Sequence, residues 1–454
     1  MEIITVLIVV MALTDAIRWC KLWAQTYVGR IMSATEQQKL NDFIAQQRQQ
    51  SCFSGFPLEG KRVIDMSSVV AAPYCAALLG DAGAEVIKIE NPMAPDALRG
   101  WGTHAETGIE PYHAYIGRNK LPITLNLKSE AGKQAFLDLI ESADVLIENM
   151  RLGVMDRLGL DHDALLELNP GLVIGKVSGY GMSGPHAHQP GFGTLAEAYS
   201  GFSFLNGYED TGPTSPPIAL ADLTTGIHLA YAVSLALHQS KRGESGGQVV
   251  DISLYEPLFG YLGGEFISYQ LTGEIPQPIG NELRAAAPRN NYQTSDGLWV
   301  AMSCSNQKTW ERLAEVMGQP ELIRDPRFKT NNDRIQADSR VALNAIIKAW
   351  MLEKTNQEAL DLFRKEGITA GPIMSMKEID EDPHYEARGS IVSMQDPASG
   401  ITIKMPDVPF RMGDNSAGNK KSKMRFPGLP MGSANAVIYR DLLGYSQAQI
   451  NQLG

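Results

Sequence analysis

Short β-branched runs alternate with helix-like runs through the first half of this 454-residue chain, and this alternation constrains its fold more than any other feature. "KRVIDMS" at 61–67 precedes the small-residue run "APYCAALLGDAG", and the strand-like "AEVIKIE" follows. The same order continues with "ITLNLK", "DVLIEN", "LVIGKVSGYG" and "GQVVDISLYE" as further strand-like segments. Strands that alternate with helices predict an α/β fold: a parallel, doubly wound, Rossmann-like sheet with ligand loops at the carboxyl ends of its strands.

The pattern changes twice along the chain. Residues 56–280 read as the first part of a large Rossmann-like domain, which ends in a linker marked by Pro276, Pro278 and Gly280. A hairpin pattern and three charged amphipathic helices then predict a smaller α+β domain over 281–388. Strand-like segments and a final helix suggest that 389–454 return to the large domain.

The N-terminal extension, 1–55, contains an apolar run from Ile3 to Leu13. This run is shorter than the roughly 20 residues that span a bilayer. Glu2 stands where a signal peptide needs positive charge, and no clear cleavage site follows. A true start at Met32, a helix that packs or anchors, and a targeting signal all remain open.

Composition and missing motifs exclude several classes of protein. The net charge of −11 argues against nucleic acid or an anionic membrane as the main partner. The four cysteines form no CxxC or Cys/His pattern, which fits reduced thiols in a cytoplasmic protein. The His186–His188 pair has no carboxylate or Cys partner at a useful spacing, so no metal site is expected. GxGxxG, P-loop and GxSxG motifs are absent from the sequence.

One carboxylate, Asp222, stands in "PPIALADLTTGIHLAYAVSLALHQ" at 216–239, between an apolar lead-in and a long apolar run. Asp is a preferred N-cap, where its side chain would accept from free N–H groups of the helix. The same position, beside the positive end of a helix, would also keep a carboxylate ionised for covalent catalysis. The residues alone leave both interpretations, cap and nucleophile, open.

Basic residues gather around the ends of the predicted strands. Cations at the carboxyl edge of a parallel sheet are well placed to bind a phosphate-bearing ligand. Taken singly, each such residue is also typical of an ordinary charged surface. The residues are Arg118, Lys120 and Lys128 in "RNKLPITLNLK" and Arg151 and Arg157 in "RLGVMDRLGLD".

The order of the segments resembles a known family. "RVIDMSSVVAAPYCAALLGDAGAEVIKIENP", "LNPGLVIGKVSGYGMSGP" and "GQVVDISLYE" are similar to the class III CoA-transferases of the CaiB/BaiF type. That family also contains formyl-CoA transferases and α-methylacyl-CoA racemases, and the likeness runs from about residue 56 to the C-terminus. In the family an Asp before a long helix is the nucleophile, and "ALADLTTGIHL" matches its position, which favours Asp222 as the nucleophile.

The resemblance implies a CoA-transferase that moves CoA from an acyl-CoA donor to a carboxylic acid acceptor. Asp222 would form anhydride and thioester intermediates, with coenzyme A as substrate and product and with no metal or redox cofactor. It also implies an interlocked homodimer. By position in the matching segments, the residues that would bind CoA are Val69, Val70, Arg99, Leu125, Lys128, Asn149, Met150, Arg157 and Leu158, with Lys128 and Arg157 on the diphosphate.

The sequence departs from the family at two loops. Many relatives carry an acidic residue where this chain has Phe192-Gly193, and racemases need an acid/base pair there. A glycine-rich loop of the formyl-CoA transferases is replaced by "NELRAAAPRNN", whose Arg284 and Arg289 would contact a carboxylate of a diacid substrate. The alternatives are a 2-methylacyl-CoA racemase or epimerase, and a non-catalytic acyl-CoA-binding protein in which Asp222 only caps its helix.

Overall fold

The computed structural model describes residues 33–49, 55–104, 106–241, 246–411 and 424–453. They form two compact units, and each is described by itself. The large unit takes its described residues from Met1–Phe202, Pro216–Ile267 and Arg388–Gly454, and the small unit consists of Ser203–Ser215 and Ser268–Ala387.

The small unit therefore contains two segments that the sequence assigned to the large domain, 203–215 and 268–280. The two segments lie together: the N–H of Gly280 donates to the carbonyl of Gly207, over 2.8 Å. A side chain at Gly280 would have its Cβ 2.3 Å from the ring of Tyr208. Because this contact joins residues far apart in the chain, the local sequence pattern could not reveal it.

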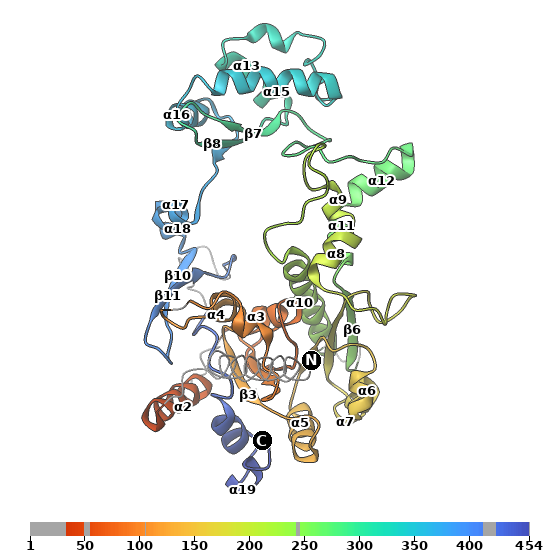
Figure 1. Ribbon diagram of the computed structural model, residues 1–454, viewed down its shortest axis with the longest axis vertical. Helices are drawn as coiled ribbons and strands as arrows, with labels where there is room; N and C mark the ends of the chain where they lie inside the picture. Colours follow the sequence, from red (N-terminus) through yellow and green to blue (C-terminus); the bar gives the residue numbers. More distant parts are fainter. Residues whose placement is uncertain (1–32, 50–54, 105, 242–245, 412–423, 454) are drawn as a thin grey trace, which may run out of the picture. The chain divides into compact units, whose positions relative to one another are not determined.

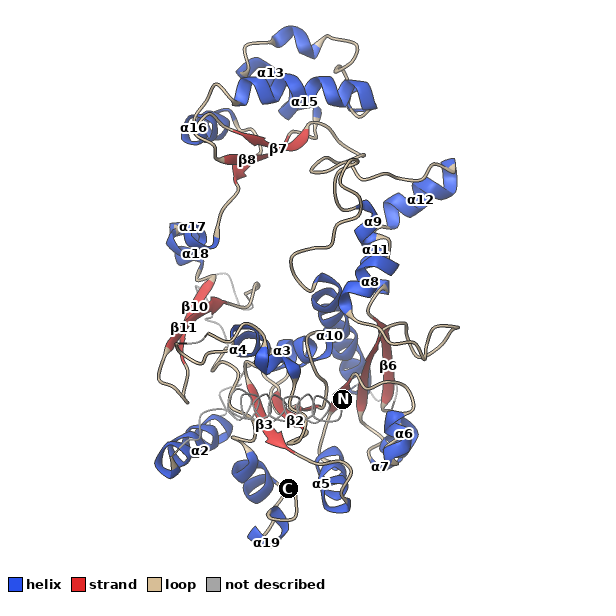
Figure 2. Cartoon of the chain, viewed as in Figure 1, coloured by secondary structure: helices blue, strands red, loops and turns tan. Residues whose placement is uncertain are grey.

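A parallel sheet of six strands forms the centre of the large unit, in the order β3-β2-β1-β4-β5-β6 (Figures 1 and 2). Neighbouring strands pair in parallel throughout, so the predicted doubly wound α/β sheet is confirmed. The strands are β1 (Arg62–Asp65), β2 (Glu85–Glu90), β3 (Lys120–Thr124), β4 (Val145–Glu148), β5 (Val173–Ser178) and β6 (Gln248–Ser253).

Strand β3 begins earlier than the predicted "ITLNLK" and ends at Thr124. Pro122 lies inside the strand, opposite Lys88 of β2. Proline lacks an N–H group and usually excludes a central strand, but an edge strand tolerates it. Since β3 is an edge strand, it can contain Pro122. Because it ends at Thr124, Leu125 and Lys128 follow the strand instead of belonging to it.

Helices cover both faces of the sheet, which explains why its central strands β1 and β4 are buried along nearly their whole length, without alternation. Val63 of β1 packs with α3 (Ala71–Asp81) and α10 (Leu220–Lys241) on one face. Ile64 points to the other face, which α5 (Glu130–Glu141) covers together with α2 (Ala34–Gln49) and the C-terminal segment.

The remaining elements of the large unit are short. The helices are η1 (Ala97–Gly100), α4 (Pro111–Ile116), α6 (Val154–Leu158), α7 (His162–Leu168), α8 (Gly193–Tyr199), α11 (Glu256–Tyr261), the π-helix η3 (Val437–Leu442) and α19 (Gln447–Ile450). All but one residue of α9 (Phe202–Leu205) and of α18 (Pro383–Arg388) belongs to the small unit. Helix α12 (Gly263–Thr272) continues into the small unit. The strand-like segments expected after 389 are β10 (Ile391–Gln395) and β11 (Thr402–Pro406), which pair as an antiparallel hairpin.

Helix α10 is the longest helix of the described chain and the one helix there that is long and apolar enough to cross a membrane. Half of its apolar window is buried, against α3 and the sheet. The opposite side carries an exposed stripe at four-residue spacing: Ile227, Tyr231 and Leu235. The helix is thus a core helix on one side and an uncovered apolar surface on the other.

Helix α2, in the N-terminal extension, belongs to the folded large unit. Leu40 and Ile44 are fully buried, and Phe43 meets the ring of Phe426 edge-on at 5.7 Å. Arg48 pairs with Glu85 over 2.6 Å. The apolar run Ile3–Leu13 lies outside the described residues.

The small unit contains the predicted hairpin and three amphipathic helices. Its antiparallel sheet joins β7 (Arg289–Gln293), β8 (Trp299–Ser303) and β9 (Ala370–Pro372). The helices are α13 (Gln307–Val316), η2 (Pro320–Ile323), α14 (Asn331–Arg334), α15 (Ala337–Met351), α16 (Asn356–Glu366) and α17 (Met376–Glu381). Their buried core is centred on Trp310, Phe328 and Phe363.

We expect Ile44→Ala to lower the free energy of unfolding of the large unit by about 2–4 kcal/mol, because it leaves a cavity under α2. Chemical denaturation with circular dichroism would measure the change. Gln46→Ala, at an exposed position of the same helix, is the matched control. An unchanged unfolding midpoint for Ile44→Ala would mean that α2 does not contribute to the core.

Candidate active site

The candidate site lies at the carboxyl edge of the sheet, between β1 and β4. The strand order reverses there, and open α/β sheets bind ligands at such a reversal. Asn149, which follows β4, holds the loop after β1: its side chain accepts from the N–H of Ser68 at 3.0 Å and donates to the Ser68 carbonyl at 2.8 Å. The structure thus brings together the β1 and β4 loops that the sequence had assigned to CoA.

The loop after β1 contains a strained residue. Val69 has a φ of 70°, a conformation that β-branched residues rarely adopt. Its N–H donates to Oδ1 of Asp96 at 2.9 Å. The ammonium of Lys88 in turn lies 3.2 Å from Oδ2 of Asp96 and also donates to the Ser67 carbonyl. Observed strain is a mark of functional loops, where the surrounding structure holds it in place.

A second buried pair anchors the start of the same loop. Lys120 donates to Asp65 at 2.8 Å and to the Pro73 carbonyl at 2.6 Å. Asp65 accepts from the N–H of Ser67 at 3.0 Å. Although burial disfavours its charge, the ammonium groups of Lys120 and Lys88 hold the pKa of Asp65 below its usual value. The pair therefore stays ionised and fixes both ends of the turn into α3.

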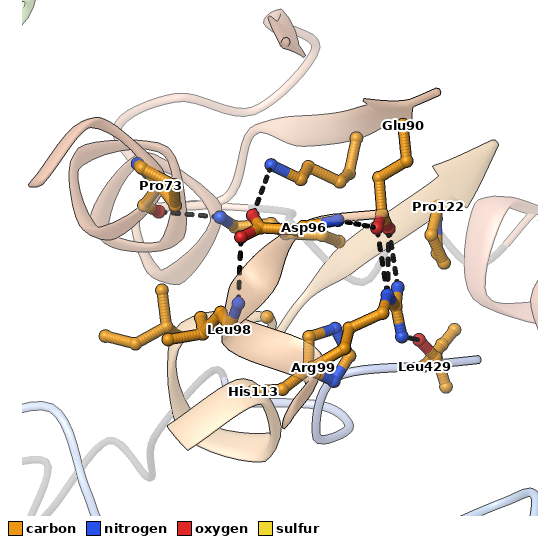
Figure 3. Close-up of a pocket in the computed structure, with 12 residues that line it drawn as sticks. Pro73, Glu90, Asp96, Leu98, Arg99, His113, Pro122 and Leu429 are labelled. Atoms are coloured by element: carbon orange, nitrogen blue, oxygen red, sulfur yellow. Dashed lines mark hydrogen bonds and ion pairs between the residues drawn. The ribbon is translucent and has the colours of Figure 1, made fainter. Parts of the chain in front are cut away.

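Figure 3 shows the pocket that this polar network lines. Arg99 lies within it, fully engaged: it donates to both oxygens of Glu90, at 2.6 Å to Oε1, and to the Leu429 carbonyl at 3.1 Å. Asp96 accepts from the N–H of Leu98 at 3.1 Å. The network ties β2, η1 and the C-terminal segment to the loop that contains Val69.

Asp222 is the third residue of α10, so the interpretation in which it is the N-cap of this helix is wrong. The first N–H groups of the helix, those of Leu220 and Ala221, donate instead to Oε1 of Glu197 on α8, at 3.0 and 3.3 Å. A carboxylate from a neighbouring helix thus replaces the local cap. Sequence proximity suggested a cap, but only the packing of α8 on α10 shows which carboxylate fills it.

The Asp222 carboxylate is half-buried and touches the backbone of α8. A Cβ at Gly193 would lie 1.9 Å from Oδ2 of Asp222. The loop before α8 closes on itself, because a Cβ at Gly179 would lie 2.7 Å from the Cα of Gly191. Gly193, which stands where many relatives carry an acidic residue, therefore provides the space that the Asp222 carboxylate occupies.

The surroundings of Asp222 raise the pKa of its carboxyl group. Burial, followed by the negative charge of Glu197, raises the pKa of Asp222 from 3.8 to about 6. No other described residue donates a hydrogen bond to its side chain. Such a carboxylate is desolvated but ionised at neutral pH, the state that a nucleophile needs.

Cluster contacts join the start of α10 to the β1 loop. Ala219 and Leu223, on either side of Asp222, pack with Val69 against the buried cluster that includes Val70. Gly226 lets α10 approach α3 closely, because a Cβ there would lie 2.6 Å from the carbonyl of Ala71. Asp222 therefore lies near the loop whose residues were predicted to bind CoA.

The predicted CoA-binding residues fall into different environments. Lys128 and Arg157 are exposed, and their side chains are accessible to a phosphate group. Leu125 is buried in the core, where its N–H donates to the Glu90 carbonyl, and Leu158 packs against the same core. The N–H of Met150 donates to Glu148 at 2.7 Å.

Three predicted basic residues are not available to a phosphate, because buried carboxylates bind them. Arg99 pairs with Glu90 and Lys120 with Asp65, as described above. Arg118 pairs with Asp81 at 2.6 Å, and its guanidinium also lies over the Tyr115 ring. The sequence could not show this, because the acidic partners come from other strands and helices.

Arg284 and Arg289 belong to the small unit, and their predicted contact with a substrate carboxylate stays a prediction. Arg289 is exposed and lines a groove of about 440 Å³ together with Asn291, Ser303 and Gly371. Arg284 is half-buried and does not line this groove. The described part of the chain has no group of three or more His, Cys, Asp and Glu side chains placed to hold a metal ion.

Glu197 is the residue beside Asp222 that the sequence interpretation missed. It is 2% exposed, in the middle of the short helix "GTLAEAY". A signal was present: an acidic residue four positions after Gly193 lies on the same helical face as that glycine. Without the position of α10, however, nothing in the sequence gave this face a partner.

Known proteins with similar sequences and structures define the class. The profile of CoA-transferase family III matches residues 58–427. The succinyl-CoA–D-citramalate CoA-transferase of Chloroflexus aurantiacus is 37% identical over 87% of this chain and 96% of its own length. The β subunit of succinyl-CoA–L-malate CoA-transferase from the same organism is 35% identical, over 87% and 96%.

A solved structure agrees with these relatives. The crystal structure of a CaiB/BaiF family protein from Brucella suis has a TM-score of 0.73 and 29% identity, and the match covers 85% of this chain and 99% of that one. The chain therefore belongs to CoA-transferase family III. It is an enzyme that transfers coenzyme A, as the shared activity of its relatives indicates.

We expect Gly193→Ala to lower kcat at least about ten-fold while the protein stays folded, because the new methyl group occupies the position of the Asp222 carboxylate. Steady-state assays of CoA transfer, with circular dichroism, would measure both. Gly171→Ala is the matched control, since a Cβ there meets only Asn169 Oδ1, at 3.6 Å. Full activity of Gly193→Ala would contradict the tight contact.

We expect Asp222→Asn to stabilise the protein near neutral pH by about 1–3 kcal/mol. Folding raises the pKa of this carboxyl from 3.8 to about 6, so the ionised form is penalised in the folded state. The penalty is absent below pH 3.8 and complete above about pH 6, and the gain should follow the same window. Denaturant titrations at several pH values measure it, and a gain independent of pH would contradict this origin.

Proposed function

We propose that this enzyme moves CoA from the CoA ester of one dicarboxylic acid to another dicarboxylic acid, through covalent intermediates on Asp222. The proposal rests on the burial and the raised pKa of the Asp222 side chain. It is a half-buried carboxylate with a raised pKa, and no other described residue donates a hydrogen bond to it. It lies in the first turn of α10, near the strained β1 loop, in a chain of CoA-transferase family III.

The first half of the reaction releases the donor acid. An Asp222 oxygen attacks the thioester carbonyl carbon, the C–S bond breaks, and the CoA thiolate leaves with the electron pair. The product is a mixed anhydride between Asp222 and the acyl group. The thiolate then attacks the Asp222 carbonyl, which frees the donor carboxylate and leaves an aspartyl-CoA thioester.

The second half reverses these steps with the acceptor. The acceptor carboxylate attacks the aspartyl thioester carbonyl, releases the CoA thiolate and forms a new mixed anhydride. The thiolate attacks the acceptor's carbonyl in that anhydride, giving the new acyl-CoA and free Asp222. No net proton is consumed, and two difficult exchanges between weak nucleophiles become four easier steps.

The chain offers groups for the charges that develop. Helix α3 begins after Val70 without a side-chain cap, so its first N–H groups can stabilise an oxyanion at the reacting carbonyl. Exposed Lys128 and Arg157 would bind the phosphates of CoA as charge-assisted donors. Asn149 would act through the loop, since both polar atoms of its side chain are engaged with Ser68.

The substrate class comes from the relatives. The two Chloroflexus enzymes are named for succinyl-CoA as donor and for citramalate or malate as acceptor, and all three acids are dicarboxylic. These names favour a transferase over a racemase, as does Gly193, which supplies no acid or base at that position. A non-catalytic acyl-CoA-binding role would not explain the raised pKa of Asp222.

We also propose that the enzyme is a cytoplasmic homodimer. The exposed stripe of Ile227, Tyr231 and Leu235 continues on α11 and α12 with Phe259 and Phe266, which are also exposed in a single chain. Apolar surfaces of this extent are rare on monomeric proteins and mark a covered interface. A second copy of this chain, interlocked as the family resemblance implies, would cover them.

The test is direct trapping of the covalent intermediate. The protein is incubated with succinyl-CoA and then with hydroxylamine, which converts an aspartyl anhydride or thioester into a hydroxamate. We expect the corresponding mass shift on the peptide that contains Asp222, and net transfer of CoA to malate but not to acetate.

Asp222→Asn is the control for the trapping experiment. It should bind succinyl-CoA as the wild type does, yet show no hydroxamate and no transfer. A wild-type enzyme that transfers CoA without an adduct at Asp222 would disprove the covalent route. Equal transfer to acetate and malate would disprove the dicarboxylic substrate class.

A further inference from the structure

We infer that Glu197 is a positioning residue for Asp222: its side chain ties α8 to the first turn of α10, and its charge acts on the nucleophile. The inference rests on the proposed role of Asp222. It adds a second carboxylate to the site, on a different helix, and it separates a structural task of Glu197 from an electrostatic one.

The structural task is visible in the hydrogen bonds. Oε1 of Glu197 accepts from the N–H groups of both Leu220 and Ala221, at 3.0 and 3.3 Å. The first turn of a helix has N–H groups without partners inside the helix, and capping them fixes where the helix begins. Since Asp222 is the next residue, the Glu197 carboxylate determines the position of the nucleophile's backbone.

Two residues of α8 act on α10 from one helical face. Gly193 and Glu197 are four residues apart, so both lie on the face of α8 that packs against the start of α10. Gly193 leaves room for the Asp222 carboxylate, with Oδ2 at 1.9 Å from where a Cβ would be. Glu197 accepts hydrogen bonds from the adjacent N–H groups. Any movement of α8 would therefore change both the space around Asp222 and the cap before it.

The electrostatic task follows from the burial of Glu197, which is 2% exposed. The two negative charges repel each other, and the burial of Glu197 weakens the screening of this repulsion by water. Because Glu197 takes the first two N–H groups of α10, these groups stabilise its charge and not that of Asp222.

Other titratable groups packed near this end of α10 have different partners. Tyr74 of α3 packs on Gly226, and Glu256 of α11 accepts from the Ser253 hydroxyl at 2.7 Å. His228 of α10 itself has Nδ1 2.8 Å from the Thr224 carbonyl. Among these groups, Glu197 is the one whose charge raises the pKa of Asp222.

The repulsion changes during the reaction. When an Asp222 oxygen attacks a thioester, its negative charge moves to the thioester oxygen and then to the departing thiolate, while the anhydride at Asp222 is neutral. The charge thus moves away from Glu197 as the bond forms. An interaction that is less unfavourable in the transition state than in the ground state accelerates the step.

Glu197→Gln separates the two tasks. The amide oxygen still accepts from Leu220 and Ala221, but the charge is removed. We expect the acid limb of the pH profile for Asp222 acylation to shift to lower pH, because the pKa of Asp222 falls. We also expect a loss of about three-fold to ten-fold in the acylation rate above pH 7, with a Tm that is not lowered and an unchanged KM for succinyl-CoA.

Glu256→Gln is the matched control, since it removes an exposed carboxylate on a helix that also packs against α10. It should leave the pH profile unchanged. Glu197→Ala removes both cap and charge, and should lower Tm as well as the rate. A Glu197→Gln enzyme whose profile and rate match the wild type would overturn the electrostatic role, as would an identical shift in Glu256→Gln.

The trapping experiment separates this inference from the proposed function. If the wild type and Glu197→Gln both form the hydroxamate at Asp222 with the same pH dependence, the covalent mechanism stands and the inference fails. If the wild type forms no adduct at Asp222, the proposed mechanism itself fails.

Discussion

The close packing of α10 on α3 is the constraint on which the site depends. Gly226 allows this approach, since any Cβ there would collide with the Ala71 carbonyl. Both helices begin at the carboxyl edge of the parallel sheet and share the core face that contains Val63. Their first turns therefore meet beside the loop after β1, where Leu223 of α10 packs in one cluster with Val69 and Val70.

Charges buried away from water hold the loops of this edge in one conformation. The Lys88–Asp96 pair supports Val69 in its left-handed conformation, and Lys120 with Asp65 fixes the turn into α3. Buried pairs contribute little net stability, because desolvation offsets their attraction, but removal of one partner is costly. Their function here is therefore precise placement, and Glu197 does the same for the start of α10.

Much of the fold could be predicted from local pattern, whereas the environment of single charges could not. The six strands are recognisable because short β-branched runs alternate with helix-like runs, and only β3, the edge strand that contains Pro122, begins earlier than expected. Lys128 and Arg157 are exposed as expected, but Arg99, Arg118 and Lys120 are buried against acidic partners. A basic residue looks the same in the sequence whether water or a distant carboxylate surrounds it, so only tertiary contacts distinguish the two cases.

The sequence by itself determined the parallel α/β sheet, the family and the candidate nucleophile, because strand and helix periodicities and the order of segments are properties of the chain alone. The tertiary structure decided that Asp222 is not the N-cap of α10, that Glu197 accepts from the first N–H groups of α10, and that Gly193 leaves room for the Asp222 carboxylate. These relations join residues on two packed helices. Their physical basis is burial and close approach, which arise only when the chain is folded.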